Sequence, residues 1–404
     1  MNDIQTRPRW SAAATVSFRW FAIFSLLFLV PLAPLTNLAI PWLGEVVLGL
    51  EGKISTAAGG STDTTAEYIR LALHAILALI GVALWTARAG ARGRHPKLVD
   101  WLTFSLRLSI ATMMFSYGLA KITGGQFSDP DDMRLLQNYG DSSPMGLLWT
   151  FMGHSKVYSG FTGIAEICGG ALLLSRRTTT LGAIVVVGVM SNVVMLNLCY
   201  DVPVKLFSMR ILVWASFLVA LDGKRLYAVF TNSGTVPPRT MGPLFSKPRR
   251  HLIGQVFKAL YGFSVILTIV FAPSFMGSRD EGSTTALQGT YEVTVFSRDG
   301  QQVPALVSDD ERWHRVVWAR WDRVFVYSAS GKRIFYAPKL EGNTLTLTRM
   351  RDDEKVVTEF TVSSDDDGLK LHSDDFQVEM EPYAPEFLLR DRGFHWVQEF
   401  PYNR

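Results

Sequence analysis

The residues best suited to chemistry lie inside or beside apolar runs that are long enough to cross a bilayer. Glu166 is a lone carboxylate within one such run, and Asn192 and Asn197 are amides within the next. Tyr117 and Lys121 close an earlier run. Ionisable side chains are costly in hydrocarbon, so they usually persist there because they function or are firmly paired. We expect Glu166, Lys121 and Tyr117 to be the reactive groups, with the amides binding a small polar molecule.

A short polar hairpin follows the second of these runs. The segment Tyr200–Lys205 carries both an acid, Asp201, and a base, Lys205, on a turn between two apolar stretches. A charged pair on so short a turn indicates a site at the membrane surface. We expect Tyr200, Asp201 and Lys205 to form the rim of a cleft whose reactive centre is Glu166.

The same residues also have a structural interpretation, in which they only hold helices together. Glu166 lies about nine residues from the outer end of its run, roughly 14 Å at the helical rise per residue, and Asn192 lies at a comparable depth. A direct hydrogen bond and a shared ligand are both compatible with this spacing. Gly163, Gly169 and Gly170 would let neighbouring helices approach closely around Glu166.

Seven apolar stretches have the length of membrane-spanning helices, roughly 17–25 residues. They lie near residues 19–43, 68–88, 101–121, 157–175, 180–199, 205–222 and 252–275. The first is too long for a cleaved signal peptide and favours a signal anchor. The candidate residues fall on the third to sixth spans. We therefore predict an α-helical integral membrane protein in a lipid bilayer, with residues 1–279 as its transmembrane domain.

Charge is divided unevenly along the chain. Residues 1–279 hold 25 Lys and Arg against 13 Asp and Glu, whereas residues 280–404 hold 15 against 23, giving about +12 and −8. The basic excess flanks the predicted spans, so it is no indication of nucleic-acid binding. With seven spans, fifteen basic residues fall on one side of the membrane and five on the other. The positive-inside rule then predicts a cytoplasmic N-terminus and a periplasmic or extracellular C-terminal domain, and we expect a bacterial inner membrane.

The acidic segment from residue 280 onward has the alternating pattern of β-strands. Eight short runs alternate polar and apolar residues between Gly-containing turn signals, which predicts an antiparallel sandwich or a small barrel. The runs are Tyr291–Phe296, Arg315–Trp318, Arg323–Tyr327, Arg333–Tyr336, Thr344–Thr348, Val356–Val362, Leu369–Leu371 and Phe376–Met380. Residues 282–404 are a candidate surface for a protein partner. No Cys/His pattern has the spacing of metal ligands, and we expect no metal site.

Four short motifs occur together between about residues 100 and 225. They are Tyr117-Gly118-Leu119-Ala120-Lys121, Glu166 followed by Gly169-Gly170, Arg176-Arg177 with Leu181-Gly182, and Asn197 followed by Tyr200-Asp201-Val202-Pro203-Val204-Lys205. Together they resemble the DoxX-like membrane proteins, whose core is a four-helix membrane bundle that would match the third to sixth spans. Some members are subunits of thiosulfate:quinone oxidoreductase or partners in redox complexes, and others act in membrane-protein assembly. The resemblance therefore implies a redox or an assembly role.

Two function classes follow. In the first, the chain is a membrane component of a redox system, and a quinone or a similar small molecule binds between the third and sixth spans. In the second, it is a non-enzymatic interaction or assembly protein whose outer β-rich domain binds a partner. A transporter is the weaker alternative, because neither an inverted repeat nor a pair of broken helices is evident in the sequence.

Overall fold

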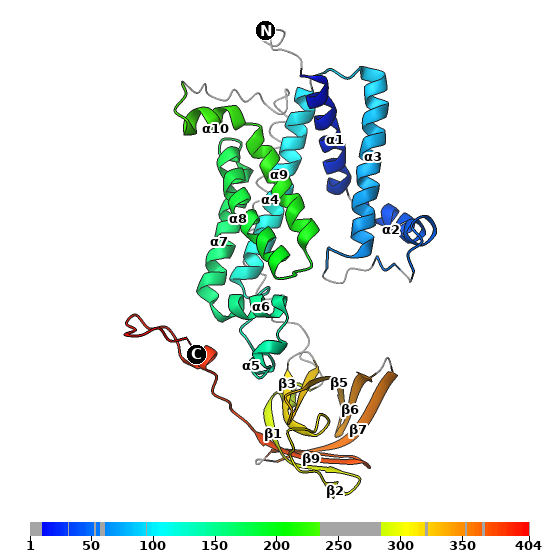
Figure 1. The fold of residues 1–404 in the computed structure, drawn as a ribbon, viewed down its shortest axis with the longest axis vertical. Coiled ribbons are helices and arrows are strands. Elements are labelled where there is room, and N and C mark those ends of the chain that lie inside the picture. Colours follow the sequence, from blue (N-terminus) through cyan, green and yellow to red (C-terminus); the bar gives the residue numbers. More distant parts are fainter. Residues whose placement is uncertain are drawn as a thin grey trace. The chain divides into compact units, whose positions relative to one another are not determined.

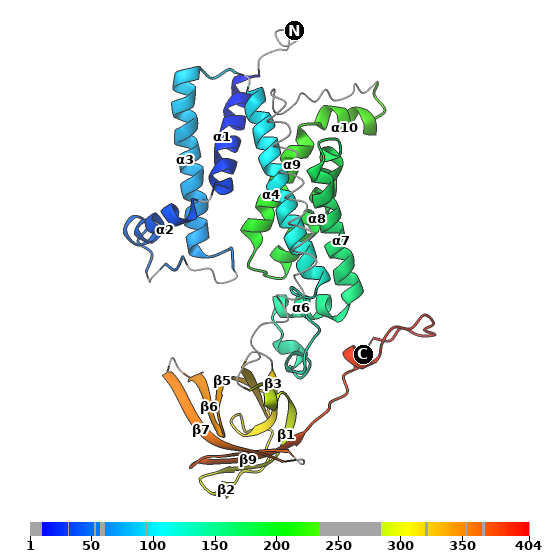
Figure 2. The same ribbon diagram turned by 180° about the vertical axis from the view of Figure 1, so that it is seen from behind.

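The computed structural model describes most of the chain and divides it into two compact units, each treated by itself below. The described residues are 10–30, 32–51, 54–56, 61–93, 95–234, 284–319, 322–351, 354–365 and 368–403. The helical unit falls within residues 1–122 and 160–268, and the barrel unit falls within residues 123–159 and 269–404 (Figures 1 and 2).

Among the described residues, five helices are long and apolar enough to cross a membrane. They are α1 (Ala12–Leu29), α3 (Thr65–Ala89), α4 (Pro96–Ile122), α7 (Lys156–Leu174) and α8 (Thr179–Cys199). A sixth crossing forms if α9 (Lys205–Ala220) and α10 (Gly223–Phe230), which meet at a 71° bend, act as one broken span. Large apolar side chains such as Ile80 and Leu84 on α3 are exposed, as expected for helices that face acyl chains. The chain therefore has the character of a membrane protein.

The predicted count of seven spans is not confirmed. The seventh, at residues 252–275, lies outside the described residues. The first, predicted at residues 19–43, has the wrong bounds, because α1 ends at Leu29 and the chain restarts as α2 (Ala33–Trp42), followed by a π-helical turn (Leu43–Val47). Pro31 follows Val30, the extended residue that caps the end of α1, and proline disfavours a helical conformation in the residue before it.

The core of the helical unit lies between α1, α4, α8 and α9. Leu102, Leu106, Ile110 and Met114 recur at every fourth position of α4, and all four are almost fully buried. This spacing places them on one face of the helix, where they pack with Trp214 of α9 and the other buried residues of the core. A rigid apolar core therefore fixes the helices that carry the candidate site residues.

The segment between α4 and α7 belongs to the barrel unit. It contains α5 (Asp132–Leu135), a 3₁₀ turn (Tyr139–Asp141) and α6 (Pro144–His154). The sequence Pro144–Gly153 is apolar yet too short to cross a membrane, and its 11-residue helix α6 agrees with that.

The C-terminal part is a closed antiparallel barrel of eight strands, which decides between the two predicted β architectures. Each strand pairs with the next along the chain, and pairing of the last with the first closes the barrel. The strands are β1 (Gly289–Arg298), β3 (Trp313–Ala319), β4 (Arg323–Ser328), β5 (Arg333–Glu341), β6 (Thr344–Arg351), β7 (Glu354–Asp365), β8 (Gly368–His372) and β9 (Phe376–Pro382). The two-residue β2 (Gln301–Gln302) pairs only with the end of β1, and α12 (Leu388–Asp391) follows β9. All eight predicted runs lie within these strands.

Side chains fill the barrel interior. Phe296, Trp313, Val316 and Val326 are among the buried residues of one continuous apolar cluster. Eight-stranded barrels have an interior just wide enough for side chains to occupy. The barrel is therefore a packed scaffold, and its candidate binding surfaces lie on the outside.

Candidate functional site

The helical unit contains a buried ion pair at the position predicted for the reactive centre. The Nζ atom of Lys121 on α4 donates to both carboxylate oxygens of Glu166 on α7, at 2.8 and 2.9 Å. The two side chains are 8% and 2% exposed. Lys121 has three N–H donors, and Glu166 accepts from two of them at most, which leaves one donor for another acceptor. The structure thus brings together two residues that the sequence placed in separate helices.

Glycines let α4 and α7 approach closely enough for this pairing. A β-carbon on Gly118 would lie 2.6 Å from the carbonyl oxygen of Gly163, and one on Gly163 would lie 2.5 Å from that of Gly118. Gly169 and Gly170 also lie in tight contacts with neighbouring helices. The prediction that glycines permit close helix packing around Glu166 is confirmed.

Tyr117 lies one helical turn before Lys121, beside the ion pair. The Lys121 ammonium is 5.8 Å from the centre of the Tyr117 ring. The same ring is 5.5 Å from Phe207 of α9. The Lys121 ammonium and the Tyr117 side chain therefore lie beside the carboxylate of Glu166, and Phe207 packs against the Tyr117 ring. This arrangement can donate hydrogen bonds to carbonyl oxygens and accept a proton.

The three other residues expected in this site lie in different settings. The Asn197 amide donates to the Ser208 hydroxyl at 3.0 Å, a buried bond that ties α8 to α9. Asn192 is exposed on α8. Tyr200 ends α8, and its backbone N–H donates to Leu196. The structure gives these residues no role around Glu166, and Asn197 has the structural role that was the alternative for the amides.

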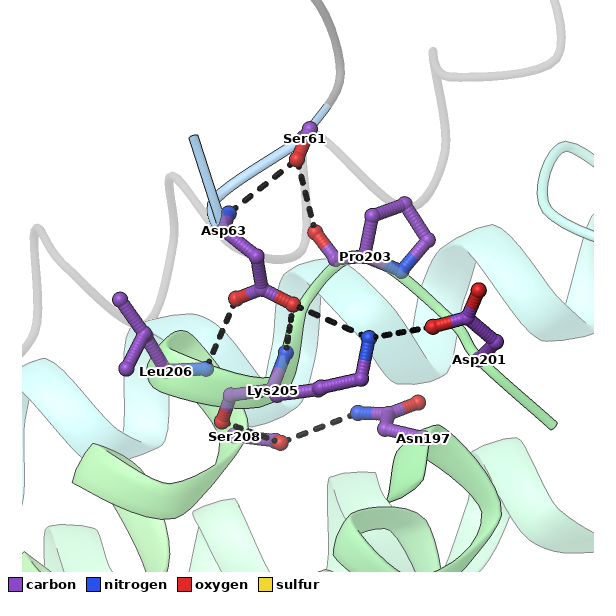
Figure 3. A network of polar contacts seen from close by, with 8 residues as sticks. All are labelled: Ser61, Asp63, Asn197, Asp201, Pro203, Lys205, Leu206 and Ser208. Atoms are coloured by element: carbon purple, nitrogen blue, oxygen red, sulfur yellow. Dashed lines mark hydrogen bonds and ion pairs between the residues drawn. The ribbon is translucent and has the colours of Figure 1, made fainter. Parts of the chain in front are cut away.

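The polar hairpin forms a network with the segment that precedes α3 (Figure 3). The Lys205 ammonium lies 2.9 Å from an oxygen of Asp201 and 3.7 Å from one of Asp63. The carboxylate of Asp63 accepts the backbone N–H groups of Lys205 and Leu206 at 2.8 and 2.9 Å. The Pro203 carbonyl accepts from the Ser61 hydroxyl and the Thr62 backbone. The hairpin thus connects two loops that are far apart in the sequence.

Asp63 is the main residue of this network that sequence reasoning missed. The first N–H groups of a helix have no intrahelical acceptor, and a carboxylate at that end satisfies them. Capping residues usually directly precede the helix that they cap, as Thr64 does for α3. Asp63 instead caps α9, 142 residues later in the chain. A local sequence signal for this contact does not exist.

Two buried arginines stabilise the helical unit away from the ion pair. Arg107 is buried and donates to the carbonyls of Leu173 and Leu174 at 2.7 and 2.9 Å. Arg19, one of the fifteen basic residues predicted to lie on the cytoplasmic side, is buried and donates to the Gly90 carbonyl and to His95. Both guanidinium groups are occupied by protein acceptors.

The barrel unit has its own candidate site, an open polar cavity between the α5–α6 segment and the β4–β5 turn. Its volume is about 660 Å³. The lining residues are Gln137, Asn138, Asp141, Asp310, Tyr327, Ser330, Gly331, Lys332 and Arg333. The Tyr327 hydroxyl donates to the Met133 carbonyl, and burial raises the pKa of Tyr327 to about 12. The α5–α6 segment is therefore held against the barrel at the edge of this cavity.

Metal binding has no support among the described residues, where no three His, Cys, Asp or Glu side chains cluster as ligands would. Cys168 and Cys199 are unpaired and exposed on their helices.

Comparison with known proteins gives a relative that has no assigned activity. The chain is 34% identical over 127 residues to "Uncharacterized protein YwoB" of Bacillus subtilis (strain 168), a stretch that covers 31% of this chain and 80% of the relative. Neither a family model nor a solved structure matches the chain. At this identity and coverage of the relative, the chain belongs to the same family as YwoB.

Proposed function

We propose that this chain is a membrane component of a redox system and that it binds the head group of a quinone, or of a similar small molecule, beside Glu166 and Lys121. The observation that carries the proposal is the buried ion pair between α4 and α7 with Tyr117 next to it. Buried ion pairs add little stability compared with apolar residues of similar volume. A pair that is kept at membrane depth is therefore a candidate for function.

The residues present fit a quinone head group. A quinone carbonyl needs hydrogen-bond donors, and Lys121 keeps one donor beyond the two that face Glu166. The Tyr117 hydroxyl supplies a second donor, and the ring of Phe207 offers an apolar face close to it. Glu166 would accept or relay the proton that quinone chemistry exchanges, because its carboxylate is the only acid in α7.

The topology proposed from the sequence suits this role. The N-terminus would be cytoplasmic in a bacterial inner membrane, and the barrel would be periplasmic or extracellular, because basic residues concentrate in the loops predicted to be inside. The resemblance of residues 100–225 to DoxX-like proteins, some of which belong to quinone-linked complexes, also favours a redox role.

The test is direct binding of a quinone to the purified full chain in mild detergent. Decylubiquinone would be titrated while tryptophan fluorescence is followed, and quinone that co-purifies would be measured by mass spectrometry. We expect saturable binding by the wild type and at least tenfold weaker binding by Lys121→Met, which is the size of effect that loss of a charged hydrogen bond has. Lys156→Met is the matched control, because Lys156 forms an exposed ion pair with Asp129. Equal binding by the wild type and Lys121→Met would contradict the proposal.

A second candidate function rests on the C-terminal tail. Phe394, Trp396, Val397 and Phe400 are highly exposed, with Trp396 at 91%. Exposed apolar side chains in a row are typical of a surface that another molecule covers. In this alternative the chain is an interaction or assembly protein, and residues 282–404 bind a protein partner. A partner that co-purifies with the full chain and is lost when those residues are deleted, without bound quinone, would favour it.

A further inference from the structure

A second polar cluster in the helical unit uses neither Lys121 nor Glu166. It brings together His74 of α3, Arg210 of α9 and Phe28 of α1, and Ser25 lies about one helical turn before Phe28 on the same helix. Ser25 is 0% exposed and His74 is 2% exposed. In the part of the chain that the structure describes, the Ser25 hydroxyl, both ring nitrogens of His74 and the Nε atom of Arg210 have no hydrogen-bond partner. Buried polar groups are nearly always bonded, so this concentration of unbonded polar atoms needs an explanation.

The ring of Phe28 holds the cluster together. It lies 4.5 Å from the His74 ring in an edge-to-face arrangement, and the Arg210 guanidinium carbon lies 4.5 Å from its centre. The same guanidinium also lies over Phe207 and Trp214, at 5.3 and 5.6 Å. These contacts hold the cation in place through cation–π attraction, but they use none of its five N–H donors.

The charges around Arg210 leave a positive excess. The charged or titratable groups that act on it are Glu67, Arg70 and Tyr117, and Arg70 and Arg210 also act on His74. Glu67 is already paired with Arg70, which in turn donates to Asn37 at 2.6 Å. Two guanidinium groups therefore face one carboxylate. Uncompensated charge inside a membrane is costly, and an anionic ligand would remove that cost.

The depth of the two arginines suits the polar head of a membrane amphiphile. Arg210 lies five residues after the start of α9, and Arg70 lies five residues after the start of α3. At the helical rise per residue, each is about 7.5 Å from its helix end. In Figures 1 and 2 these two helix starts lie at the same end of the helical unit, and α1 runs towards that end.

We propose that Arg210, His74 and Ser25 form a binding site for a phosphate group, supplied either by an anionic lipid head group or by free phosphate. The Arg210 guanidinium would bind two phosphate oxygens through paired N–H donors, the geometry for which arginine is favoured. The imidazole of His74 and the hydroxyl of Ser25 would donate to the remaining oxygens. The site adjoins the proposed quinone site, because Phe207 contacts both Tyr117 and Arg210, but it uses neither Lys121 nor Glu166.

The test measures ligand-dependent stability of the full chain, purified in dodecyl maltoside and freed of lipid. The midpoint of thermal unfolding is followed by tryptophan fluorescence during titration with dioleoylphosphatidylglycerol, dioleoylglycerol or inorganic phosphate at constant ionic strength. A ligand that binds only the folded state raises this midpoint. We expect a saturable rise with dioleoylphosphatidylglycerol and none with dioleoylglycerol, which lacks the phosphate. A rise with inorganic phosphate alone would support the site and identify the free anion as its ligand.

Three variants assign the effect to the cluster. Arg210→Gln should weaken the apparent affinity on the order of tenfold, the effect of losing charge-assisted hydrogen bonds. Arg177→Gln removes an exposed charge from the loop between α7 and α8 and should leave the affinity unchanged. If Arg210→Gln does not yield folded protein, His74→Phe keeps the ring contact with Phe28, removes the donors and should also weaken binding. The proposal is overturned if no phosphate compound raises the wild-type midpoint, or if the cluster variants respond as Arg177→Gln does.

Discussion

Gly118 of α4 and Gly163 of α7 face one another so closely that their backbones touch. A β-carbon added to either would lie 2.6 or 2.5 Å from the carbonyl oxygen of the other. Lys121 and Glu166 each lie three residues further along the same helices, about one turn away. The ion pair and the glycine contact are therefore one structural feature, since the contact sets the helix separation across which the ion pair forms.

This relationship predicts that Gly163→Ala destabilises the helical unit. The new methyl group has no room, because the obstructing atom is backbone, and overpacking of this kind costs about 1–3 kcal/mol. Gly160→Ala is the matched control on the same helix, where a β-carbon would meet no atom within 4 Å. Thermal unfolding in detergent should show a lower midpoint for Gly163→Ala only. Equal midpoints for the two variants would mean that the helices do not touch at Gly163.

The ion pair itself predicts a strong coupling between Lys121 and Glu166. Removing one partner of a buried pair costs about 3–5 kcal/mol, because the other charge is left without compensation. Lys121→Met and Glu166→Gln should each destabilise the chain, and the double variant should be less destabilised than the sum of the two. A double-mutant cycle on unfolding measures this coupling. The exposed pair of Lys156 and Asp129 serves as the control, with an expected coupling of about 0–1 kcal/mol. Additive effects at Lys121 and Glu166 would contradict the pairing.

The sequence predicts those elements of the fold that carry a local signal, namely the barrel strands and most of the membrane spans. Alternation of polar and apolar residues placed all eight barrel strands, and glycine at turn positions marked their ends, as at Gly331, whose φ is +87°. Helix length and hydropathy located most of the spans. The break between α1 and α2 was missed, because the mean hydropathy of a segment does not show that proline interrupts a helix. The available signals were Pro31, directly after the residue that caps the end of α1, and Pro34, in the first turn of α2.

Contacts between distant segments could not be predicted in the same way. Depth arithmetic placed Glu166 and Asn192 at a similar level, but it does not give the direction of a side chain around its helix. Glu166 faces α4 and is buried, whereas Asn192 is exposed. The cap of α9 by Asp63 depends on the packing of two loops that are 142 residues apart. Such contacts are set by tertiary packing, and one sequence carries no local sign of them.

The network at the hairpin predicts that Asp63→Ala frees the start of α9. Loss of a capping carboxylate costs about 1 kcal/mol, because two backbone N–H groups lose their acceptor. Amide hydrogen exchange at Lys205 and Leu206 should become faster in this variant. Asp201→Ala is the control, since Asp201 is mostly exposed and bonds only the Lys205 side chain among the described contacts. Unchanged exchange at Lys205 in Asp63→Ala would contradict the cap.

The barrel unit predicts a loss of stability at high pH through Tyr327. Burial raises the pKa of this phenol to about 12, above its ordinary value near 10, and its hydroxyl donates to the Met133 carbonyl. Because the folded state holds the proton more tightly than the unfolded state, the stabilisation is complete below pH 10. It is lost as the pH rises from 10 towards 12. Tyr327→Phe should cost about 1 kcal/mol at neutral pH through the lost hydrogen bond. It should also remove this pH dependence and the last step in tyrosinate absorbance at 295 nm. Tyr402→Phe, which removes a phenol from the C-terminal tail, is the control, and a persisting last step in Tyr327→Phe would assign that step to another tyrosine.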